Sequence, residues 1–491
     1  MNRLERLRRA LARRMQWLAD RRPGAGTDRG RAAAKSTERE LVALAWPIAA
    51  AMLGETGIAL VDTKLVATLG AAALGGVGVA IVLMYLCYSL VFGLMRGVKV
   101  RTAYAFGQDR PEDGVRYAHA GLILGGLLGA GVWLVTRDVT WILEALAVDP
   151  AIVPYARDFL SARTYAAPAT CALAALIQHR QGTGDSRTPM IVGLGGNVVN
   201  ATLAYCLIHG HLGLPALGVR GAGYGTAITE VLEVSALLVV LAREMRSRVR
   251  PALSLKAALR EVADLGVPTG VHFGLETLAF TMFTAVLAGI GANEIAAHHI
   301  ALNTIRASFL PGVAVAEAAS VLVGRSLGRR DLAEADRVTR SALGLAVGFM
   351  SLCGVVFGLF GGAIAGVFTS DTEVIAIARR LLIVAALFQT LDAVNMVLRG
   401  ALRGAKDVRW VAIVGTTVAW SCIPGSAYLL GRVAEWGAFG GWCGFVVETS
   451  LCAALLWRRW TTGAWRAPFV GPAEAGRVSA PTLTPAPVSV G

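Results

Sequence analysis

Long apolar runs, separated by short polar segments, recur along the chain from Leu41 onward. A helix needs about 20 apolar residues to cross the roughly 30 Å hydrocarbon core of a bilayer. Twelve runs approach or exceed that length, and we predict a membrane-spanning helix in each. The predicted spans are 42–67, 74–97, 116–136, 157–180, 189–209, 221–242, 263–290, 296–322, 340–368, 377–400, 410–430 and 438–458. The predicted fold is therefore an all-α integral membrane protein.

Composition agrees with this pattern. Hydrophobic residues make up 55% of the 491 residues and charged residues only 16%, whereas a soluble domain is about 25% charged. Mean hydropathy is +0.58. The seven cysteines are scattered singly and form no Cys-x-x-Cys pair. The sequence therefore indicates neither a zinc site nor a disulfide framework.

The distribution of basic residues predicts an orientation. If the N-terminus is inside, the inside segments hold 37 Lys and Arg and the outside segments hold 6. Inside loops of membrane proteins carry this excess, so we expect both termini in the cytoplasm, and the protein in the inner or plasma membrane. The net charge of +14 then reflects topology, and we expect no nucleic-acid partner.

An internal repeat divides the chain. At a shift of 221, Pro47 aligns with Pro268, Glu55 with Glu276, and Gly107 with Gly328. Six spans in each copy make the repeats parallel, with a ligand site expected between them. We predict a basic leader (1–40), an N-lobe (41–242), a cytoplasmic linker (243–261), a C-lobe (262–460) and a disordered tail (461–491). The leader either lies on the anionic inner leaflet or is disordered.

Two related turns mark equivalent positions of the repeat. An apolar run ends in Gly182–Arg187 in the first copy and in Gly404–Arg409 in the second. Both turns contain glycine, an aspartate and flanking polar or basic residues. In the second copy a lone carboxylate, Asp392, lies inside the apolar run.

Several segments together resemble the multidrug and toxic compound extrusion (MATE) family, across about residues 40–460. Leu60–Thr63 resembles its first-helix Val-Asp-Thr, and Gly182–Pro189 its loop after the fourth helix. Ala296–Asn303 resembles the family's Ala-Ala-His-Gln-Ile-Ala-Leu-Asn, and Ala319–Arg325 also follows its pattern. The resemblance implies a two-lobed, twelve-helix antiporter that expels organic cations in exchange for Na⁺ or H⁺.

Within the family the chain is more similar to the NorM-type branch. That branch places acids in the seventh and tenth helices, which correspond here to Glu276 and Asp392. The DinF-type branch has a second acid one turn after the helix-five Asn, whereas here Asn200 is followed by Ala204.

Three carboxylates in the middle of predicted spans are the main candidates for transport chemistry. Asp62, Glu276 and Asp392 each cost about 2.5–3.5 kcal/mol to insert. An acid that binds a passenger cation explains that cost, and a hydrogen-bonded acid that joins two helices is the structural alternative. Na⁺ also takes neutral oxygens, which Asn303, Thr277 or backbone carbonyls would supply. The Na⁺ ligands predicted from the sequence are Glu276 and Asp392.

Glu55 and Asn200 complete the candidate coupling-ion and substrate site. Glu55 lies seven residues before Asp62 on one stripe of the first helix, so it predicts either a second cation site or an acid neutralised by Lys64 or Arg96. Asn200 either lines the N-lobe cavity or cross-links helices. We note five more polar residues in predicted spans: Glu230, Glu233, Glu317, Glu448 and Arg306.

His298 and His299 near the outer end of the eighth span are interpreted mainly as packing residues. A pH-sensing role is the alternative.

These observations predict a cation-coupled antiporter that exports organic cations by alternating access. It is expected to be a monomer, with no cofactor beyond the transported Na⁺ or H⁺. The alternatives are a flippase for lipid-linked sugars, which requires a basic cavity, and a membrane scaffold without transport. No nucleophile motif, phosphate loop or metal spacing is present, so the sequence does not indicate an enzyme.

Overall fold

A computed structural model describes residues 28–138, 140–145, 148–246 and 251–469. Most of these residues are helical and none of them lies in a strand, which confirms the predicted all-α fold. The first-half helices are α2 (Asp28–Ala67), α3 (Ala71–Gly107), α4 (Pro111–Thr136), α5 (Thr140–Ala145), α6 (Val153–Arg163), η1 (Thr164–Ala166), α7 (Ala167–Gly182), α8 (Arg187–His209) and α9 (Val219–Arg246). The second-half helices are α10 (Leu255–Ala288), α11 (Ala292–Gly328), α12 (Leu332–Phe368), α13 (Thr372–Gly404), α14 (Val408–Ser426), η2 (Ala427–Val433), α15 (Gly437–Thr462) and η3 (Ala464–Phe469).

Eleven helical segments within the described residues are long and apolar enough to cross a membrane. The fourth predicted span, 157–180, is interrupted: α6 and α7 are joined by the single 3-10 turn η1. Pro168 stands in the first turn of α7, where its missing N–H costs nothing.

Both ends of the described chain differ from the prediction. Helix α2 begins at Asp28, inside the segment predicted as a leader. In the predicted tail, η3 is helical, and buried Trp465 stacks on Trp460 at 4.3 Å between ring centroids. The rest of the leader (1–27), part of the linker (247–250) and the tail from 470 lie outside the described residues.

The helix boundaries reproduce the repeat. Helices α3 and α11 are related by a shift of 221 residues at both ends, from 71 to 292 and from 107 to 328. The same shift relates the starts of α8 and α14, at 187 and 408. The chain is therefore an integral membrane protein built from two parallel repeats.

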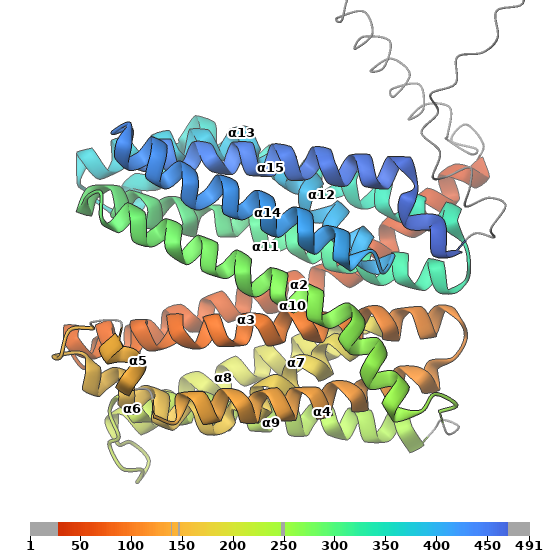
Figure 1. Cartoon of the computed structure of the whole chain (residues 1–491). Helices are drawn as coiled ribbons and strands as arrows, with labels where there is room; N and C mark the ends of the chain where they lie inside the picture. Colours follow the sequence, from red (N-terminus) through yellow and green to blue (C-terminus); the bar gives the residue numbers. More distant parts are fainter. Residues whose placement is uncertain (1–27, 139, 146–147, 247–250, 470–491) are drawn as a thin grey trace, which may run out of the picture.

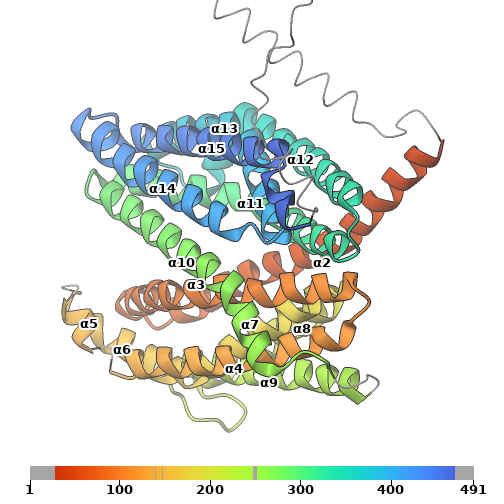
Figure 2. The ribbon, with the colours of Figure 1, turned by 45° about the vertical axis from the view of Figure 1, so that its right-hand side comes forward.

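The two repeats form two bundles that lie side by side (Figures 1 and 2). Helix α10 crosses from the first bundle to the second and packs along α3. Glycines permit this approach: a Cβ on Gly93 would lie 2.6 Å from Cα of Gly270, and a Cβ on Gly97 2.6 Å from the carbonyl oxygen of Val262. The centre of the molecule is α11, since 72% of its most apolar window is buried, against 22% for α12.

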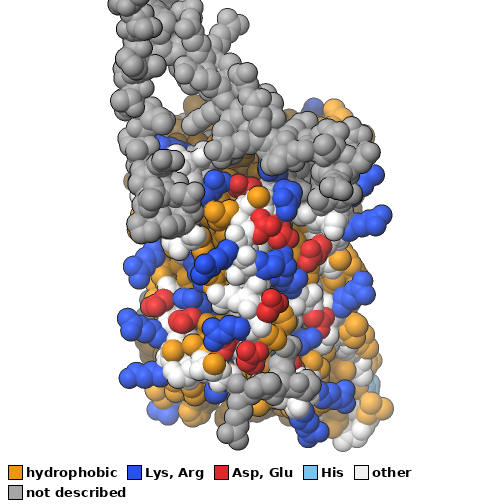
Figure 3. Space-filling model, turned by 90° about the vertical axis from the view of Figure 1, so that its right-hand side faces the viewer, with side chains coloured by type: hydrophobic (Ala, Val, Ile, Leu, Met, Phe, Trp, Pro, Cys, Tyr) orange, Lys and Arg blue, Asp and Glu red, His pale blue; other side chains and the backbone are white. Residues whose placement is uncertain are grey.

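One end of the molecule carries many Lys and Arg side chains, interspersed with Asp and Glu (Figure 3). The loops between α3 and α4 and between α11 and α12 lie at this end (Figure 1). These are loops that the sequence predicts on the cytoplasmic side.

Candidate functional site

Glu276 of α10 forms an ion pair with Arg399 of α13, where guanidinium Nη1 donates to carboxylate Oε1 at 2.6 Å. The same guanidinium donates through Nη2 to Oε1 of Glu448 on α15 at 3.2 Å, and through Nε to the side-chain oxygen of Asn395 at 2.9 Å. Asp392, one and a half to two turns before Arg399 on α13, is buried and interacts electrostatically with Arg399, Glu448 and Glu276. Three carboxylates thus surround one guanidinium, which leaves the C-lobe cluster with a formal charge of −2.

His272 borders this cluster. Its Nε2 lies 3.7 Å from Oε2 of Glu276, one turn further along α10, and its Nδ1 lies 3.1 Å from the hydroxyl of Thr416 on α14. Gly415 leaves room for the ring, because a Cβ there would lie 2.4 Å from Cε1 of His272. The imidazole therefore fills the space between α10 and α14 beside the predicted acid.

In the N-lobe the structure brings Asp62 of α2 and Asn200 of α8 together. The Asn200 amide donates to Oδ2 of Asp62 at 3.4 Å. The two remaining oxygens, Oδ1 of Asp62 and Oδ1 of Asn200, are buried and accept no hydrogen bond from the described residues. Two neighbouring oxygens of this kind match the ligand preference of a hard cation.

Three further acids of the N-lobe form a group of their own. Glu230 of α9 pairs with Arg163 of α6 and accepts a hydrogen bond from Thr170 at 2.5 Å. Glu55 and Glu233 interact electrostatically with Glu230 and with each other. Among the described residues, the carboxylates of Glu55, Glu230 and Glu233 are accompanied by one paired cation, Arg163, so this N-lobe cluster has a formal charge of −2.

A third charged cluster joins the two bundles. Glu317 of α11 is buried and pairs with Arg96 and Lys99 of α3 and with Arg403 of α13. The distances from Oε1 of Glu317 are 3.2 Å to Arg96 and 3.3 Å to Arg403. Arg96, one of the two cations expected to neutralise Glu55, is therefore engaged with Glu317 instead.

The other residues noted in the sequence have simpler environments. Asn303, Arg306 and Lys64 are exposed. The Thr277 hydroxyl donates to the carbonyl of Phe273 at 2.8 Å, within α10. His298 is buried and accepts a hydrogen bond from the Trp442 indole at 3.1 Å, which supports the packing interpretation. Among the described residues, His, Cys, Asp and Glu form no group of three or more that is arranged to hold a metal ion.

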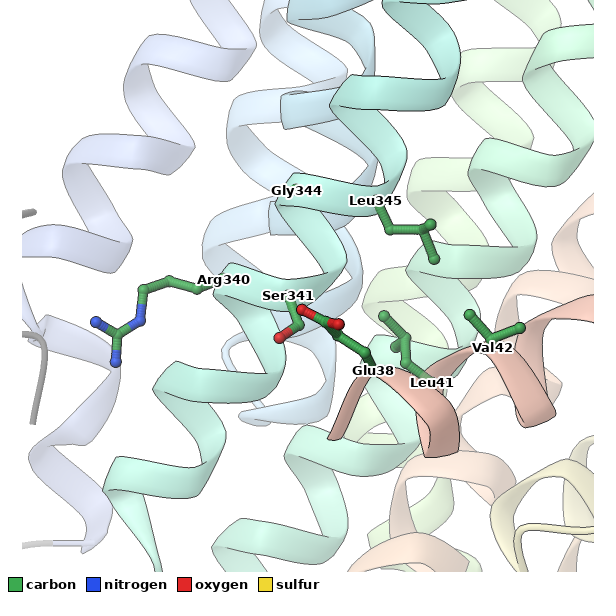
Figure 4. A pocket seen from close by; sticks show the side chains of 7 residues that line it. All are labelled: Glu38, Leu41, Val42, Arg340, Ser341, Gly344 and Leu345. Atoms are coloured by element: carbon green, nitrogen blue, oxygen red, sulfur yellow. The ribbon is translucent and has the colours of Figure 1, made fainter. Parts of the chain in front are cut away.

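A surface groove of about 430 Å³ lies between α2 and α12 (Figure 4). Its lining residues are Glu38, Leu41, Val42, Arg340, Ser341, Gly344 and Leu345. None of the candidate transport acids is among them, so this groove is separate from the charged clusters.

Comparison with known proteins defines the family. The MatE family model matches residues 47–206 and 268–426, and these two matches coincide with the two repeats. The chain belongs to the MATE family. It is 30% identical over 448 residues to the multidrug resistance protein NorM of Burkholderia vietnamiensis, covering 88% of this chain and 96% of that one. The NorM-type resemblance is thereby confirmed.

Solved MATE structures share the fold at low sequence identity. A mutant of the Vibrio cholerae MATE transporter VcmN aligns with a TM-score of 0.81 at 18% identity, covering 88% of this chain and 98% of that one. A MOP superfamily transporter from Pyrococcus furiosus, described as having a binding pocket of reverse polarity, aligns with a TM-score of 0.78 at 20% identity, over 88% and 97% of the two chains. MATE proteins are multi-pass membrane transporters of small molecules and not enzymes, so this chain is a multidrug transporter of that family.

Three features of the site go beyond what the sequence predicts. The pattern of apolar runs places Arg399 at the very end of the predicted span 377–400, gives Glu317 no partner and does not single out Arg163. The sequence does mark these three residues as unusual, because each is an ionisable residue in or near an apolar run. The pairings are not visible, because Arg399 and Glu276 lie 123 residues apart in the sequence.

Proposed function

We propose that this MATE-family chain is a secondary antiporter that exports organic cations in exchange for Na⁺ or H⁺ by alternating access. It acts as a monomer in the plasma membrane, with both termini and the linker in the cytoplasm. We assign the N-lobe to residues 41–242 and the C-lobe to residues 262–460, a division that the two helical bundles support.

The coupling ion binds in the N-lobe, at Asp62 and Asn200. The observation that supports this is the pair of buried side-chain oxygens without a hydrogen-bond donor among the described residues. A proton on Asp62 would supply one donor, and Na⁺ would bind both oxygens. Glu55 and Glu233 add negative charge to the same lobe, which favours the entry of a cation.

The C-lobe acids Glu276 and Asp392 play a different part. The Glu276 carboxylate is already paired with Arg399, whereas Asp62 has no ion pair among the described residues, so Na⁺ gains less at Glu276 than at Asp62. The remaining formal charge of −2 favours the cationic group of the transported solute. Asn303, exposed on α11, is available as a polar contact for that solute.

Transport in proteoliposomes tests this assignment. Ethidium efflux is measured under separately imposed Na⁺ and pH gradients for the wild type and for Asp62→Asn and Glu276→Gln. We expect the wild type to respond to at least one gradient, and Asp62→Asn to lose about tenfold or more of the gradient-driven component. Glu276→Gln should raise the ethidium concentration needed for half-maximal transport while retaining the response to the gradient.

Two results contradict the proposal. Gradient-driven export that persists in Asp62→Asn but disappears in Glu276→Gln would move the coupling site to the C-lobe. Absence of gradient-driven ethidium export in the wild type would exclude cation antiport.

A further inference from the structure

The Glu317 cluster contains more cations than one carboxylate can neutralise. Arg96, Lys99 and Arg403 all pair with Glu317, which gives a formal charge of +2. Lys99 and Glu317 have side chains that are 1% and 4% exposed. Isolated charges are costly in such surroundings, so a second anion beside these cations would lower the free energy of the folded protein.

The cluster lies next to the negatively charged C-lobe cluster. Arg399 and Arg403 are four residues apart on α13, a separation of about 6 Å along the helix. Arg399 belongs to the cluster of charge −2 and Arg403 to the cluster of charge +2. A positive and a negative site therefore stand side by side, one helical turn apart, and together they match the two ends of a zwitterion.

Arg96 is the partly exposed member of the positive site. Its side chain is 19% exposed, and its guanidinium lies 4.8 Å from the ring centroid of Phe273 on α10. Exposed Tyr85 interacts electrostatically with both Arg96 and Arg306. An aromatic solute with a carboxylate would find there a ring to stack on and a guanidinium to bind.

We propose that Arg96, Lys99 and Arg403 form a subsite for the carboxylate of an amphoteric aromatic solute, and that Glu317 is a resident anion with which this carboxylate competes. The amine of the same solute lies toward Glu276, Asp392 and Glu448. The subsite proposal takes one point from the proposed function, namely that the transported solute carries a positive charge. It does not depend on coupling to an ion gradient, because binding to the subsite is an equilibrium property.

A matched pair of dyes provides the probe: a rhodamine with a free carboxylate, and its methyl ester, which carries only the positive charge. Fluorescence polarisation measures the binding of each to the purified full chain in detergent. In Arg96→Gln we expect the acid to bind about 10- to 100-fold more weakly and the ester to bind as in the wild type. Arg220→Gln, an exposed pair with Asp158, is the control and should alter neither affinity.

Glu317→Gln distinguishes competition between Glu317 and the ligand from a clasp, meaning here a purely structural role of Glu317 in holding α3, α11 and α13 together. Competition predicts that the acid binds more tightly once the resident anion is removed, while the ester is unaffected. A clasp predicts weaker binding of both dyes and a lower thermal midpoint. If Glu317→Gln does not fold, the Arg96→Gln comparison still decides, because Arg96 is partly exposed and its removal leaves Glu317 paired with Lys99 and Arg403.

Three outcomes would overturn the subsite. The first is an equal loss of affinity for both dyes in Arg96→Gln, and the second is an unchanged affinity of Arg96→Gln for the acid. The third is a wild type whose thermal midpoint rises with inorganic phosphate or pyrophosphate but which does not bind the acid. The last result would indicate a phosphate ligand, as expected for a lipid-linked sugar. Failure of export is recognised separately, since dye binding would then persist while neither gradient drives efflux.

Discussion

Nη1 of Arg399 on α13 lies 2.6 Å from Oε1 of Glu276 on α10. This contact places a cation against one of the acids that we propose to bind the transported solute. The guanidinium also contacts Glu448 and Asn395, so all of its nitrogens have a partner. A passenger cation at Glu276 must therefore coexist with Arg399 or displace it.

The pair predicts non-additive stability. Arg399→Gln leaves buried carboxylates without their cation, and Glu276→Gln leaves the cation with fewer anions. Breaking a buried pair costs about 3–5 kcal/mol, whereas removing both partners costs less. We expect each single variant to lower the thermal midpoint in detergent and the double variant to recover part of the loss. Strictly additive shifts would show that the two charges are not coupled.

The Gly182–Arg187 turn gives a pH-dependent prediction. Asp185 pairs with Arg180 and accepts a hydrogen bond from the Thr188 N–H at 3.0 Å. Burial raises the pKa of Asp185, but the hydrogen bonds from Arg180 and Thr188 outweigh it and hold the pKa below its usual value. The ionised form thus stabilises the fold above the unfolded pKa of about 3.9, and this contribution is lost as the pH falls through the folded pKa.

Asp185→Asn should therefore lower the free energy of unfolding by about 1 kcal/mol near pH 7. The difference from the wild type should shrink as the pH falls below about 4. Thermal midpoints recorded against pH measure this. A difference that grows in acid would contradict the assigned sign.

The sequence predicts what the bilayer imposes. Apolar runs of about 20 residues are required by lipid, so the spans and the 221-residue shift are readable from the order of residues alone. The break at Thr164–Ala166 is not predicted, because Val153–Arg163 and Ala167–Gly182 follow each other in the sequence with no polar loop between them. The start of α2 at Asp28 is missed because helical periodicity is weak in an Ala- and Arg-rich segment.

The site is predicted less completely than the fold. The cost of inserting a carboxylate into the membrane singles out Asp62, Glu276 and Asp392. The internal repeat places Glu55 at the position equivalent to Glu276. Hydropathy does not report which charge meets which. The charges of the N-lobe cluster, the C-lobe cluster and the Glu317 cluster depend on Arg163, Arg399 and Glu317, whose partners are set by helix packing.

Contact between the bundles at Gly107 and Gly328 predicts a steric effect. A Cβ on Gly107 would lie 2.1 Å from the carbonyl oxygen of Arg325 on α11, so α3 and α11 would have to separate. We expect Gly107→Ala to destabilise the protein by about 1–3 kcal/mol. Gly126→Ala on α4 is the matched control, because a Cβ there meets nothing within 4 Å. Equal thermal midpoints for the two variants would contradict the close approach.

The turn after α13 yields the last prediction. The Lys406 ammonium lies 3.1 Å from the ring centroid of Tyr104. Burial, together with nearby Arg101, lowers the pKa of Lys406 to about 7. An unfolded lysine titrates near 10.4. Between about pH 7 and 10.4 the unfolded chain binds one more proton than the folded chain, so stability should rise with pH in this window.

Replacing the lysine should remove that rise. The methionine of Lys406→Met has no proton to release. We expect the thermal midpoint of this variant to exceed that of the wild type at pH 7. The midpoints of the two proteins should converge near pH 10. Lys35→Met, at an exposed position on α2, is the control and should leave the wild-type slope intact. A Lys406→Met protein that is less stable than the wild type at pH 7 would mean that the contact of the ammonium with Tyr104 outweighs the cost of burying the charge.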